Sequence, residues 1–507
     1  MEIKIVIDGT EPIKEYTLMS AEPISFIEVM NQLGLNFYRP CGGVLKCLSC
    51  AIRFIYGAPD MTSDDEKALD FSEMRNGWRL GCKCIINKDC KIQVPVSLVG
   101  EITSPVDADV DEEYPLDKTN IGIAVDIGTT TIATAVVDLQ TGKILRQNNC
   151  TNNQIKYGAD VMSRIKASMD GHGEDLMNIV REDLIKIGRD VVGEDFLTHK
   201  IVFSANTVMT HLFLNYPVDG LANYPFVPYT TEAISFVSEY RDVFFMPPIS
   251  AFVGGDIVAG LYFLKKKAME RSEKASKETF LLVDLGTNAE IVLFDGEKYW
   301  CSSASAGPAL EGASISCGVA SVKGAINHLS ISEGKIKYTT IGGEKPVGLC
   351  GSGIIDMVHE LHRNKIIDDG GLLIEKYADT GFPVTDNIYM TGEDIQQVLL
   401  AKSAIYSAIT VLAKKAGIAF EEIEHLYISG GLGATASVWS SAGINLFPSE
   451  LINKYESVGN SSLLGAIAYV MDSDQAAITE IKEKSEVVIL ANDPEFEALF
   501  LENLMLK

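Results

Sequence analysis

A strand pattern that occurs twice limits what this chain can fold into. In the first copy, an apolar strand ends at Asp126 and turns at Gly128 into a second apolar strand. In the second copy, about 160 residues later, the first strand ends at Asp284 and the turn lies at Gly286. An internal repeat of this kind predicts two related lobes, each with a tight hairpin that carries an aspartate.

The two turns have the composition of phosphate-binding loops. Backbone N–H groups of glycine and threonine, together with threonine hydroxyls, can hold phosphate oxygens. One Asp-x-Gly-Thr is a common turn signal, but two copies, each between two strands, are much more specific. We expect the two aspartates to face each other across a cleft. The residues expected to hold a nucleotide's phosphates are Gly128, Thr129, Thr130, Thr131, Gly286, Thr287 and Asn288.

A third motif follows downstream, where the strand His425–Ser429 enters a turn at Gly430 and Gly431. Glycine allows a flat base or ribose to lie against the backbone. The three motifs together resemble the phosphate and adenosine motifs of the actin, sugar-kinase and Hsp70 superfamily. The resemblance implies a duplicated, ribonuclease H-like α/β ATPase fold, in which Phe252–Gly260 resembles the connecting helix. Asp256 is then a third carboxylate at the phosphate end, or alternatively a helix cap.

Four cysteines near the N-terminus have the order of a 2Fe-2S site. A plant-type loop uses a C-x4-C-x2-C run and a distant fourth cysteine, and here the first spacing is one residue longer. Four cysteines also satisfy tetrahedral zinc, but zinc ribbons pair two short C-x2-C units, and Cys84 and Cys90 lie at the wrong distances. We predict a 2Fe-2S cluster, with structural zinc as the alternative. The predicted ligands are Cys41, Cys47, Cys50 and Cys82.

The sequence around these cysteines predicts an α+β ferredoxin domain of the β-grasp type. Alternating isoleucines predict a first strand, and a turn leads to a second, so the chain begins with a hairpin. An amphipathic helix is then expected before the cysteine loop. The expected elements are strands 3–7 and 13–18, a helix between Pro23 and Gly34, a strand 51–55, a helix 63–71 and a strand 90–96.

A stretch rich in acidic residues and proline separates this domain from the rest of the chain. Such a composition without apolar periodicity predicts a linker, although a surface loop of one merged domain is the alternative. The predicted domains are a ferredoxin-like domain 1–98, an acidic linker 99–119, a first ATPase lobe 120–275 and a second ATPase lobe 276–507.

Composition excludes some functions. The formal net charge of -26 disfavours nucleic-acid binding through a basic face. Six of the ten cysteines fall in the first ninety residues, which is typical of a cofactor site in a large chain. The N-terminus has no signal-peptide pattern, and no uninterrupted apolar run has the length of a membrane span. We therefore expect a cytoplasmic protein without a membrane or nucleic-acid partner.

Taken together, the motifs resemble those of the ATP-dependent reductive activators of corrinoid proteins, which join an N-terminal 2Fe-2S domain to an actin-like ATPase. The resemblance covers nearly the whole sequence. It implies an enzyme that reduces the inactive Co(II) corrinoid of a methyltransferase's corrinoid protein to Co(I), using a 2Fe-2S cluster, ATP and Mg²⁺. It further implies an electron donor of the ferredoxin or flavodoxin type and a homodimer. The motifs are Cys41 to Cys82, Tyr157–Asp160, Asp284–Asn288, Ala306–Pro308, Glu311–Ala313, Cys350–Gly353, Gly430–Gly431 and Val458–Asn460.

The resemblance also implies roles for the predicted site residues. The four cysteines would ligate iron, Asp126 and Asp284 would organise Mg²⁺ and the attacking water, and Gly430 and Gly431 would lie at the adenosine. Two departures stand out. Val44–Lys46 occupies the place where family loops often have a further glycine, and the middle domain that some relatives have before the ATPase is expected to be missing.

Three other functions remain open at this point. The chain could be a redox sensor or scaffold that binds nucleotide without useful turnover. It could activate another low-potential enzyme such as a radical dehydratase, although such activators resemble a single ATPase whose cluster bridges two subunits. A metabolite kinase with an appended ferredoxin is the third alternative, and no sugar or acyl pocket is evident in the sequence.

Overall fold

The structure is a computed structural model that describes residues 1–8, 14–33, 35, 37, 50–67, 69–95, 120–158, 160–194, 196–238, 241–332, 334–432 and 435–506. The predicted cluster ligands Cys41 and Cys47 and the predicted linker 99–119 lie outside these residues. The chain divides into two compact units. The first consists of Met1–Thr103, Pro308–Leu399 and Leu506, and the second of Ser104–Gly307 and Leu400–Met505.

The N-terminal part of the first unit is a five-stranded mixed sheet in the order β2-β1-β7-β4-β5. β1 pairs antiparallel with β2 and parallel with β7, while β4 is antiparallel to both β7 and β5. A separate two-stranded antiparallel sheet is formed by β3 and β6. The strands are β1 (Glu2–Asp8), β2 (Lys14–Met19), β3 (Ile24–Ser25), β4 (Ala51–Tyr56), β5 (Trp78–Leu80), β6 (Ile85–Ile86) and β7 (Cys90–Pro95).

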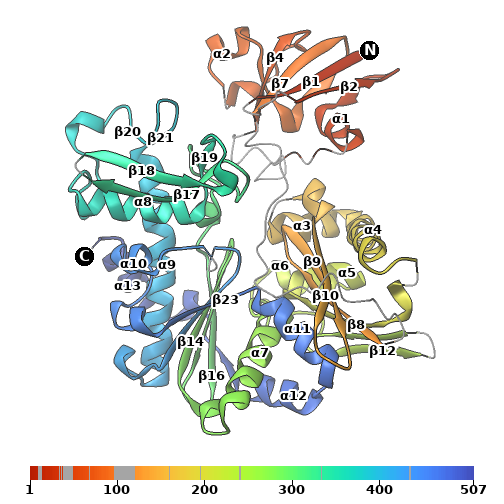
Figure 1. Ribbon diagram of the computed structural model, residues 1–507, viewed down its shortest axis with the longest axis vertical. Helices are drawn as coiled ribbons and strands as arrows, with labels where there is room; N and C mark the ends of the chain where they lie inside the picture. The colour runs from red at the N-terminus through yellow and green to blue at the C-terminus, as the bar shows by residue number, and fades with distance from the viewer. Residues whose placement is uncertain are drawn as a thin grey trace. The chain divides into compact units, whose positions relative to one another are not determined.

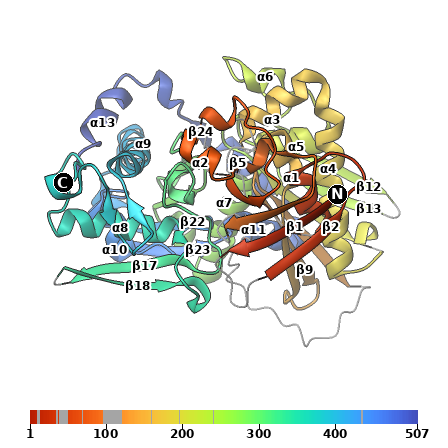
Figure 2. The same ribbon diagram turned by 90° about the horizontal axis from the view of Figure 1, so that it is seen from above.

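One helix, α1 (Phe26–Gln32), lies against this sheet (Figure 1, Figure 2) and shares an apolar core with it. Successive side chains of a strand point to opposite faces, so Ile3, Ile5 and Ile7 of β1 share one face and are all buried. Phe26, Val29 and Met30 of α1 belong to the same apolar cluster. The predicted hairpin and helix are therefore present.

The predicted helix 63–71 is wrong. A 3-10 helix, Asp65–Lys67, and a separate α2, Phe71–Arg75, occupy this region instead. Asp70 accepts a hydrogen bond from the Glu73 amide at 2.7 Å, and the Glu73 side chain accepts one from the Asp70 amide at 2.9 Å. This capping box fixes the start of α2 at Phe71, because it satisfies two amides that a continuous helix would otherwise use.

The remainder of the first unit, within residues 308–399, contains a three-stranded sheet in the order β18-β17-β19, a two-stranded sheet of β20 and β21, and α8. α8 packs against β17 in this part of the fold (Figure 1). The elements are β17 (Ala325–Ser332), β18 (Lys335–Thr340), β19 (Gly348–Leu349), α8 (Gly351–Arg363), β20 (Phe382–Pro383) and β21 (Tyr389–Met390).

The next helix, α9 (Gly392–Ala416), runs from the first unit into the second. By length and composition it could cross a membrane, but 72% of its most apolar 18-residue window is buried in the protein. Lys402 in this helix is fully buried and donates to the Met505 carbonyl at 2.6 Å. These contacts are those of a core helix in a folded domain.

The second unit contains two six-stranded sheets that share the order of five strands, while the sixth strand, β12 or β24, lies at opposite edges. Their orders are β10-β9-β8-β11-β13-β12 and β23-β22-β14-β15-β16-β24. In the first sheet, β8 pairs antiparallel with β9 and parallel with β11. In the second sheet, β14 pairs antiparallel with β15 and parallel with β22. The strands of the first sheet are β8 (Ile121–Ile127), β9 (Thr131–Asp138), β10 (Ile144–Thr151), β11 (Lys200–Ala205), β12 (Ile234–Ser238) and β13 (Arg241–Phe245). Those of the second are β14 (Phe280–Leu285), β15 (Ala289–Phe294), β16 (Tyr299–Ala304), β22 (His425–Ser429), β23 (Tyr455–Gly459) and β24 (Ser485–Val487). The predicted duplication is confirmed.

Two helices, α7 (Gly255–Arg271) and α11 (Ser461–Asp472), lie between these sheets (Figure 1). They share one apolar cluster with residues of both sheets. α4 and α5 cover the other face of the first sheet. The remaining helices of the unit are α3 (Val161–Ala167), α4 (Gly173–Val191), α5 (Thr207–Leu214), α6 (Asp219–Ala222), α10 (Val438–Gly443), α12 (Gln475–Glu483) and α13 (Phe496–Glu502).

Candidate functional site

The two predicted phosphate hairpins form equivalent turns in the second unit. The Gly128 amide donates to the Thr131 carbonyl at 2.9 Å, and the Gly286 amide donates to the Asn288 carbonyl at 3.0 Å. A Cβ atom on Gly128 would lie only 2.8 Å from the Thr131 oxygen, so this turn closes only around a glycine. Thr129, Thr130, Thr131 and Thr287 are partly exposed and Asn288 is exposed, which leaves their polar groups within reach of a ligand.

Polar side chains donate hydrogen bonds to the turn of the first hairpin and hold it in place. Arg164 of α3 donates to the Thr129 carbonyl at 2.6 Å and to the Gly158 carbonyl at 2.9 Å. Asn152 donates to the Gly128 carbonyl at 2.9 Å, and Asn206 donates to the Thr129 hydroxyl at 3.2 Å. Burial lowers the pKa of Arg164 to about 9, with Asp160 opposing that shift. The Tyr157–Asp160 motif therefore leads into the helix that carries this support.

Asp126, near the end of β8, accepts hydrogen bonds from residues at the start of α11. Asn460 Nδ2 donates to Oδ2 at 2.8 Å, and Ser462 Oγ donates to Oδ1 at 2.7 Å. Burial raises the pKa of Asp126, while these hydrogen bonds act in the opposite direction by favouring its ionised form. Asn460 belongs to the Val458–Asn460 motif, which predicts no role for this residue, and Ser462 lies outside the motifs found in the sequence.

Three further carboxyl groups lie within electrostatic reach of one another. Burial and the charges of Asp284 and Asp126 raise the pKa of Asp256 to about 7. Burial, Asp256 and Asp284 together raise the pKa of Glu290 well above its ordinary value. Glu290 faces Asp284 directly across the β14–β15 pair, so the structure brings together the three predicted aspartates and adds one glutamate. The signal for Glu290 was a charged residue inside an apolar strand.

The alternative role of Asp256 as a helix cap is wrong. α7 begins at Gly255 and its capping position is Gly254, which makes no side-chain cap. Asp256 instead accepts from the Ile257 amide at 2.8 Å inside the first turn. Its position beside the other carboxylates matches the role of a third acidic group at the phosphate end.

This acidic cluster fits a divalent cation in its chemistry. A cation would compensate the like charges that raise the pKa values of Asp256 and Glu290. Within the described part of the chain, no three histidine, cysteine, aspartate or glutamate residues form a ready-made metal cage. Mg²⁺ usually keeps several waters and binds one or two carboxylates together with substrate phosphates, so an open arrangement of carboxylates suits it.

The two glycines predicted at the adenosine differ in their surroundings. Gly430 has a φ of 87°, and a Cβ there would lie 2.5 Å from the Leu285 carbonyl and 2.9 Å from an Asp284 carboxylate oxygen. Its lack of a side chain is thus required by its positive φ and by the close Leu285 backbone carbonyl. A Cβ on Gly431 would meet nothing within 4 Å, so its backbone faces open space, as an adenosine site requires.

In the N-terminal sheet, the two described cluster cysteines lie on adjacent strand ends. Cys50 precedes β4 and Cys82 follows β5, and the Gly81 amide donates to the Cys50 carbonyl at 2.9 Å. A Cβ on Gly81 would meet Phe37 at 2.8 Å and the Cys50 oxygen at 3.1 Å. The glycine therefore allows the close approach of the two cysteine-bearing segments.

A buried polar network holds the Cys82 turn. Asp65 accepts from the Leu80 amide at 2.8 Å and from the Thr62 amide at 2.9 Å. Arg79 Nη2 donates to the Pro59 carbonyl at 2.7 Å, and its Nε lies 4.0 Å from Asp65. These contacts fix the backbone immediately before Gly81.

Cys84 and Cys90 behave as core residues. Both are buried, and burial raises the pKa of Cys84 to about 12 and that of Cys90 to about 11. Both also belong to the apolar cluster of the N-terminal sheet. Of the four predicted cluster ligands, the structure describes Cys50 and Cys82, whereas Cys41 and Cys47 lie outside the described residues.

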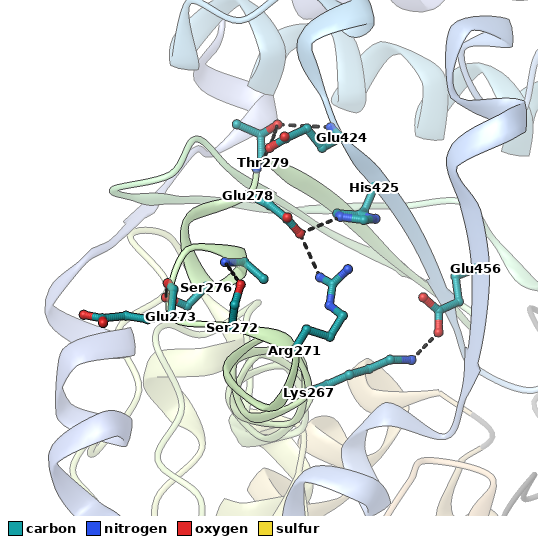
Figure 3. A network of polar contacts seen from close by, with 11 residues as sticks. Lys267, Arg271, Ser272, Glu273, Ser276, Glu278, Thr279, Glu424, His425 and Glu456 are labelled. Atoms are coloured by element: carbon teal, nitrogen blue, oxygen red, sulfur yellow. Dashed lines mark hydrogen bonds and ion pairs between the residues drawn. The ribbon is translucent and has the colours of Figure 1, made fainter.

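The far end of α7 is tied to the second sheet by the polar network in Figure 3. Arg271 donates to Glu278 at 2.8 Å, His425 contacts the same carboxylate oxygen at 2.9 Å, and Lys267 pairs with Glu456. The pKa of Glu278 is lowered, chiefly by the hydrogen bond with His425. α7 therefore carries Asp256 at one end and is anchored to strands β22 and β23 at the other.

Two family models match most of the ATPase part of the chain. One, described as the C-terminal domain of RACo, the ASKHA domain, matches residues 278–507, and the other, described as the RACo middle region, matches residues 121–269. The expectation that the middle domain is missing is therefore wrong. Residues 121–269 contain the first sheet, and the strand pattern of this sheet predicts an ATPase lobe and not a separate middle domain.

Named relatives agree with these matches. The chain is 31% identical over 428 residues, which are 77% of this chain and 71% of the relative, to "Corrinoid activation enzyme RamQ" of Eubacterium limosum. It is 24% identical over 421 residues, or 75% of this chain and 76% of the relative, to "[Co(II) methylated amine-specific corrinoid protein] reductase" of Methanosarcina barkeri. A solved structure, "Reductive activator for corrinoid,iron-sulfur protein", matches with a TM-score of 0.65 and 25% identity, covering 100% of this chain and 98% of that one.

Proposed function

The chain belongs to the family of corrinoid activation enzymes, and on that premise we propose that it reduces the inactive Co(II) corrinoid of a methyltransferase's corrinoid protein to Co(I) in an ATP-dependent, one-electron step. One observation supports this most strongly. A single chain combines duplicated, aspartate-bearing hairpins with Cys50 and Cys82 on adjacent strand ends. One part suits nucleotide binding and the other suits a one-electron carrier.

The N-terminal sheet supports a β-grasp ferredoxin domain over residues 1–98, joined by the linker 99–119 to ATPase lobes 120–275 and 276–507. In this proposal Cys41, Cys47, Cys50 and Cys82 hold a 2Fe-2S cluster, which supplies one-electron transfer when bound. The buried Asp65–Arg79 network holds the Cys82 turn in place, and Gly81 lets it approach Cys50.

The nucleotide part of the proposal assigns each group a role. Asp126, Asp284 and Asp256 organise Mg²⁺ and the attacking water, while the Gly128–Thr131 and Gly286–Asn288 turns hold phosphates. Phosphoryl transfer needs positioning and charge neutralisation more than a covalent nucleophile, and the half-buried carboxylates provide the positioning. Gly431 has the open backbone that an adenosine requires.

ATP is needed because the electron must move to a low-potential metal. For a one-electron couple, about 59 mV corresponds to about 1.4 kcal/mol. A shift of roughly 180 mV then requires about 4 kcal/mol of differential binding, slightly above the typical coupling between two sites. In the proposal, lobe closure on nucleotide supplies this energy by favouring a complex with altered cobalt ligation.

The same proposal includes the partners. They are the corrinoid protein, a low-potential donor of the ferredoxin or flavodoxin type, and a second copy of this chain in a homodimer, all in the cytoplasm. The net charge of -26 suits a partner with a basic patch.

An anaerobic assay tests the function directly. The reconstituted protein is incubated with a low-potential reductant and a Co(II) corrinoid protein, with or without ATP, and Co(I) is followed by its absorption. We expect Co(I) only with ATP. Asp284→Asn should abolish this while preserving the cluster spectrum, whereas Asp379→Asn, at an exposed position, should behave as wild type.

Two results would contradict the proposal. One is equal Co(I) formation without ATP, and the other is no Co(I) with any corrinoid protein tested. ATP binding without turnover would favour the redox-sensing alternative instead.

A further inference from the structure

The first turn of α11 contacts Asp126 of the first hairpin directly and is linked to Asp284 of the second hairpin through Ser429. Asn460 and Ser462 donate to the two carboxylate oxygens of Asp126 at 2.8 Å and 2.7 Å. The carbonyl oxygen of the Asn460 side chain also accepts from the Leu463 amide at 2.8 Å, which caps the helix. Asn460, which caps the N-terminus of α11, therefore also donates a hydrogen bond to Asp126.

The residue between them, Ser461, reaches the other aspartate through one intermediate. Ser461 Oγ lies 2.7 Å from Ser429 Oγ, and Ser429 Oγ donates to Asp284 Oδ2 at 2.9 Å. A hydroxyl has one proton to donate. Because Ser429 gives its proton to Asp284, Ser461 must donate to Ser429, and the chain of hydrogen bonds has a fixed direction toward Asp284.

Burial makes these contacts energetically important. Ser429 and Ser461 are each 1% exposed and Ser462 is 4% exposed. Water therefore has little access to replace a lost donor, and a buried acceptor left without its partner carries the full cost of desolvation. Hydrogen bonds to a charged acceptor are also stronger than those between neutral groups.

Close packing against α7 holds the turn in place. A Cβ on Gly260 would lie 2.7 Å from Ser461 Oγ, and a Cβ on Gly465 would lie 1.9 Å from the Ala259 carbonyl. The two glycines let the helices approach at backbone distance. α7 carries Asp256 in its own first turn, so this helix pair includes one predicted aspartate, contacts Asp126 directly and is linked to Asp284 through Ser429.

We propose that Asn460, Ser461 and Ser462 form a positioning clip that fixes Asp126 of one lobe relative to Asp284 of the other. Three consecutive residues hold carboxylates that lie 158 residues apart in the chain. A relative shift of the two hairpins must stretch or break a contact of this turn. The inference rests on the proposed nucleotide site, and it assigns these residues the geometry of that site without direct contact to the nucleotide.

The test uses ATP hydrolysis by the full-length, cluster-loaded protein without a corrinoid partner. The variants are Ser461→Ala, Ser462→Ala and the double variant, with Ser441→Ala as the matched control. Ser441 is also a buried serine, and its hydroxyl has no hydrogen-bond partner among the described residues. Phosphate release gives kcat and KM, equilibrium binding gives the ATP affinity, and the cluster spectrum reports on folding.

We expect kcat to fall about 10- to 100-fold in Ser462→Ala, the range for one hydrogen bond to a charged group. Ser461→Ala should lower kcat by less, because Ser429 still donates to Asp284. KM and ATP affinity should change by less than about threefold, since the turn does not touch the nucleotide. The double variant should deviate from the product of the single effects, because contacting residues of one network are coupled.

Different failures have different meanings. Wild-type kcat in both single variants, with active wild-type protein, would overturn the clip and leave the proposed function intact. A parallel loss of ATP affinity and cluster content would also overturn it, because that pattern is general misfolding. If Ser462→Ala does not fold, Ser461→Ala carries the test alone, since Asn460 and Ser462 still donate to Asp126. A wild-type protein that neither binds nor hydrolyses ATP would overturn the proposed function and the clip together.

Discussion

Replacing Gly465 with alanine should separate α7 from α11 and destabilise the second unit. The new Cβ would lie 1.9 Å from the Ala259 carbonyl oxygen and 2.7 Å from the Ala259 Cα. Ordinary contact begins at 3.4 Å, so the helices would have to move apart by about 1.5 Å, because a backbone carbonyl cannot rotate away.

The magnitude follows from two opposing effects. Alanine favours a helix interior over glycine by about 1 kcal/mol. Overpacking typically costs about 1–3 kcal/mol, and a clash with backbone belongs at the upper end. The net loss is then about 2 kcal/mol. For a unit of about 310 residues, with an unfolding entropy of about 2.1 cal/mol/K per residue, this corresponds to a fall in the thermal midpoint of about 3 °C.

Calorimetry on the full-length protein measures this change, with Gly392→Ala as the control. Gly392 is the first residue of α9, and a Cβ there would meet nothing within 4 Å. The control should therefore unfold within about 0.5 kcal/mol of wild type. An unchanged or raised midpoint in Gly465→Ala would refute the argument that backbone contact between α7 and α11 requires a glycine.

Two other predictions concern the first unit. Gly81→Ala should push the Cys82 turn away from Cys50 and lower the 2Fe-2S absorption per chain after reconstitution, whereas Gly370→Ala, whose nearest neighbour would be 3.4 Å away, should not. Full cluster content in Gly81→Ala would contradict the proposed ligand geometry. The hydrogen bond that the His328 ring donates to the Asp356 carboxylate raises the pKa of His328, so its stabilising effect should be complete below about pH 6.5 and be lost as the pH rises through the folded value. Denaturation midpoints at acidic and alkaline pH should show this loss in wild type and not in His328→Gln, and an identical pH dependence in both would count against it.

Some sequence predictions succeeded because local pattern was sufficient. The β8–β9 and β14–β15 hairpins follow from apolar strands that flank a glycine turn, and the structure has both. The N-terminal hairpin and α1 follow in the same way from alternation and helical periodicity. The predicted helix 63–71 was wrong because the capping box at Asp70 makes a helix begin at Phe71. The spacing of apolar residues does not show where such a cap lies. The expectation that the middle domain is missing was wrong. Residues 121–269 match the RACo middle region, and their strand pattern is also the one expected of an ATPase lobe.

The repeated hairpins, the cysteine order and the identity of three carboxylates can be read from the amino-acid sequence, since each depends on neighbours along the chain. The side chains that surround the carboxylates become known only from the folded chain. Asn460 lies 334 residues from Asp126, and before folding an asparagine ahead of a helix predicts no more than a cap. Glu290 joins the acidic cluster because strand register places it opposite Asp284. Long-range contacts of this kind arise from helix packing and strand pairing, so the partners of the predicted aspartates had to be found in space.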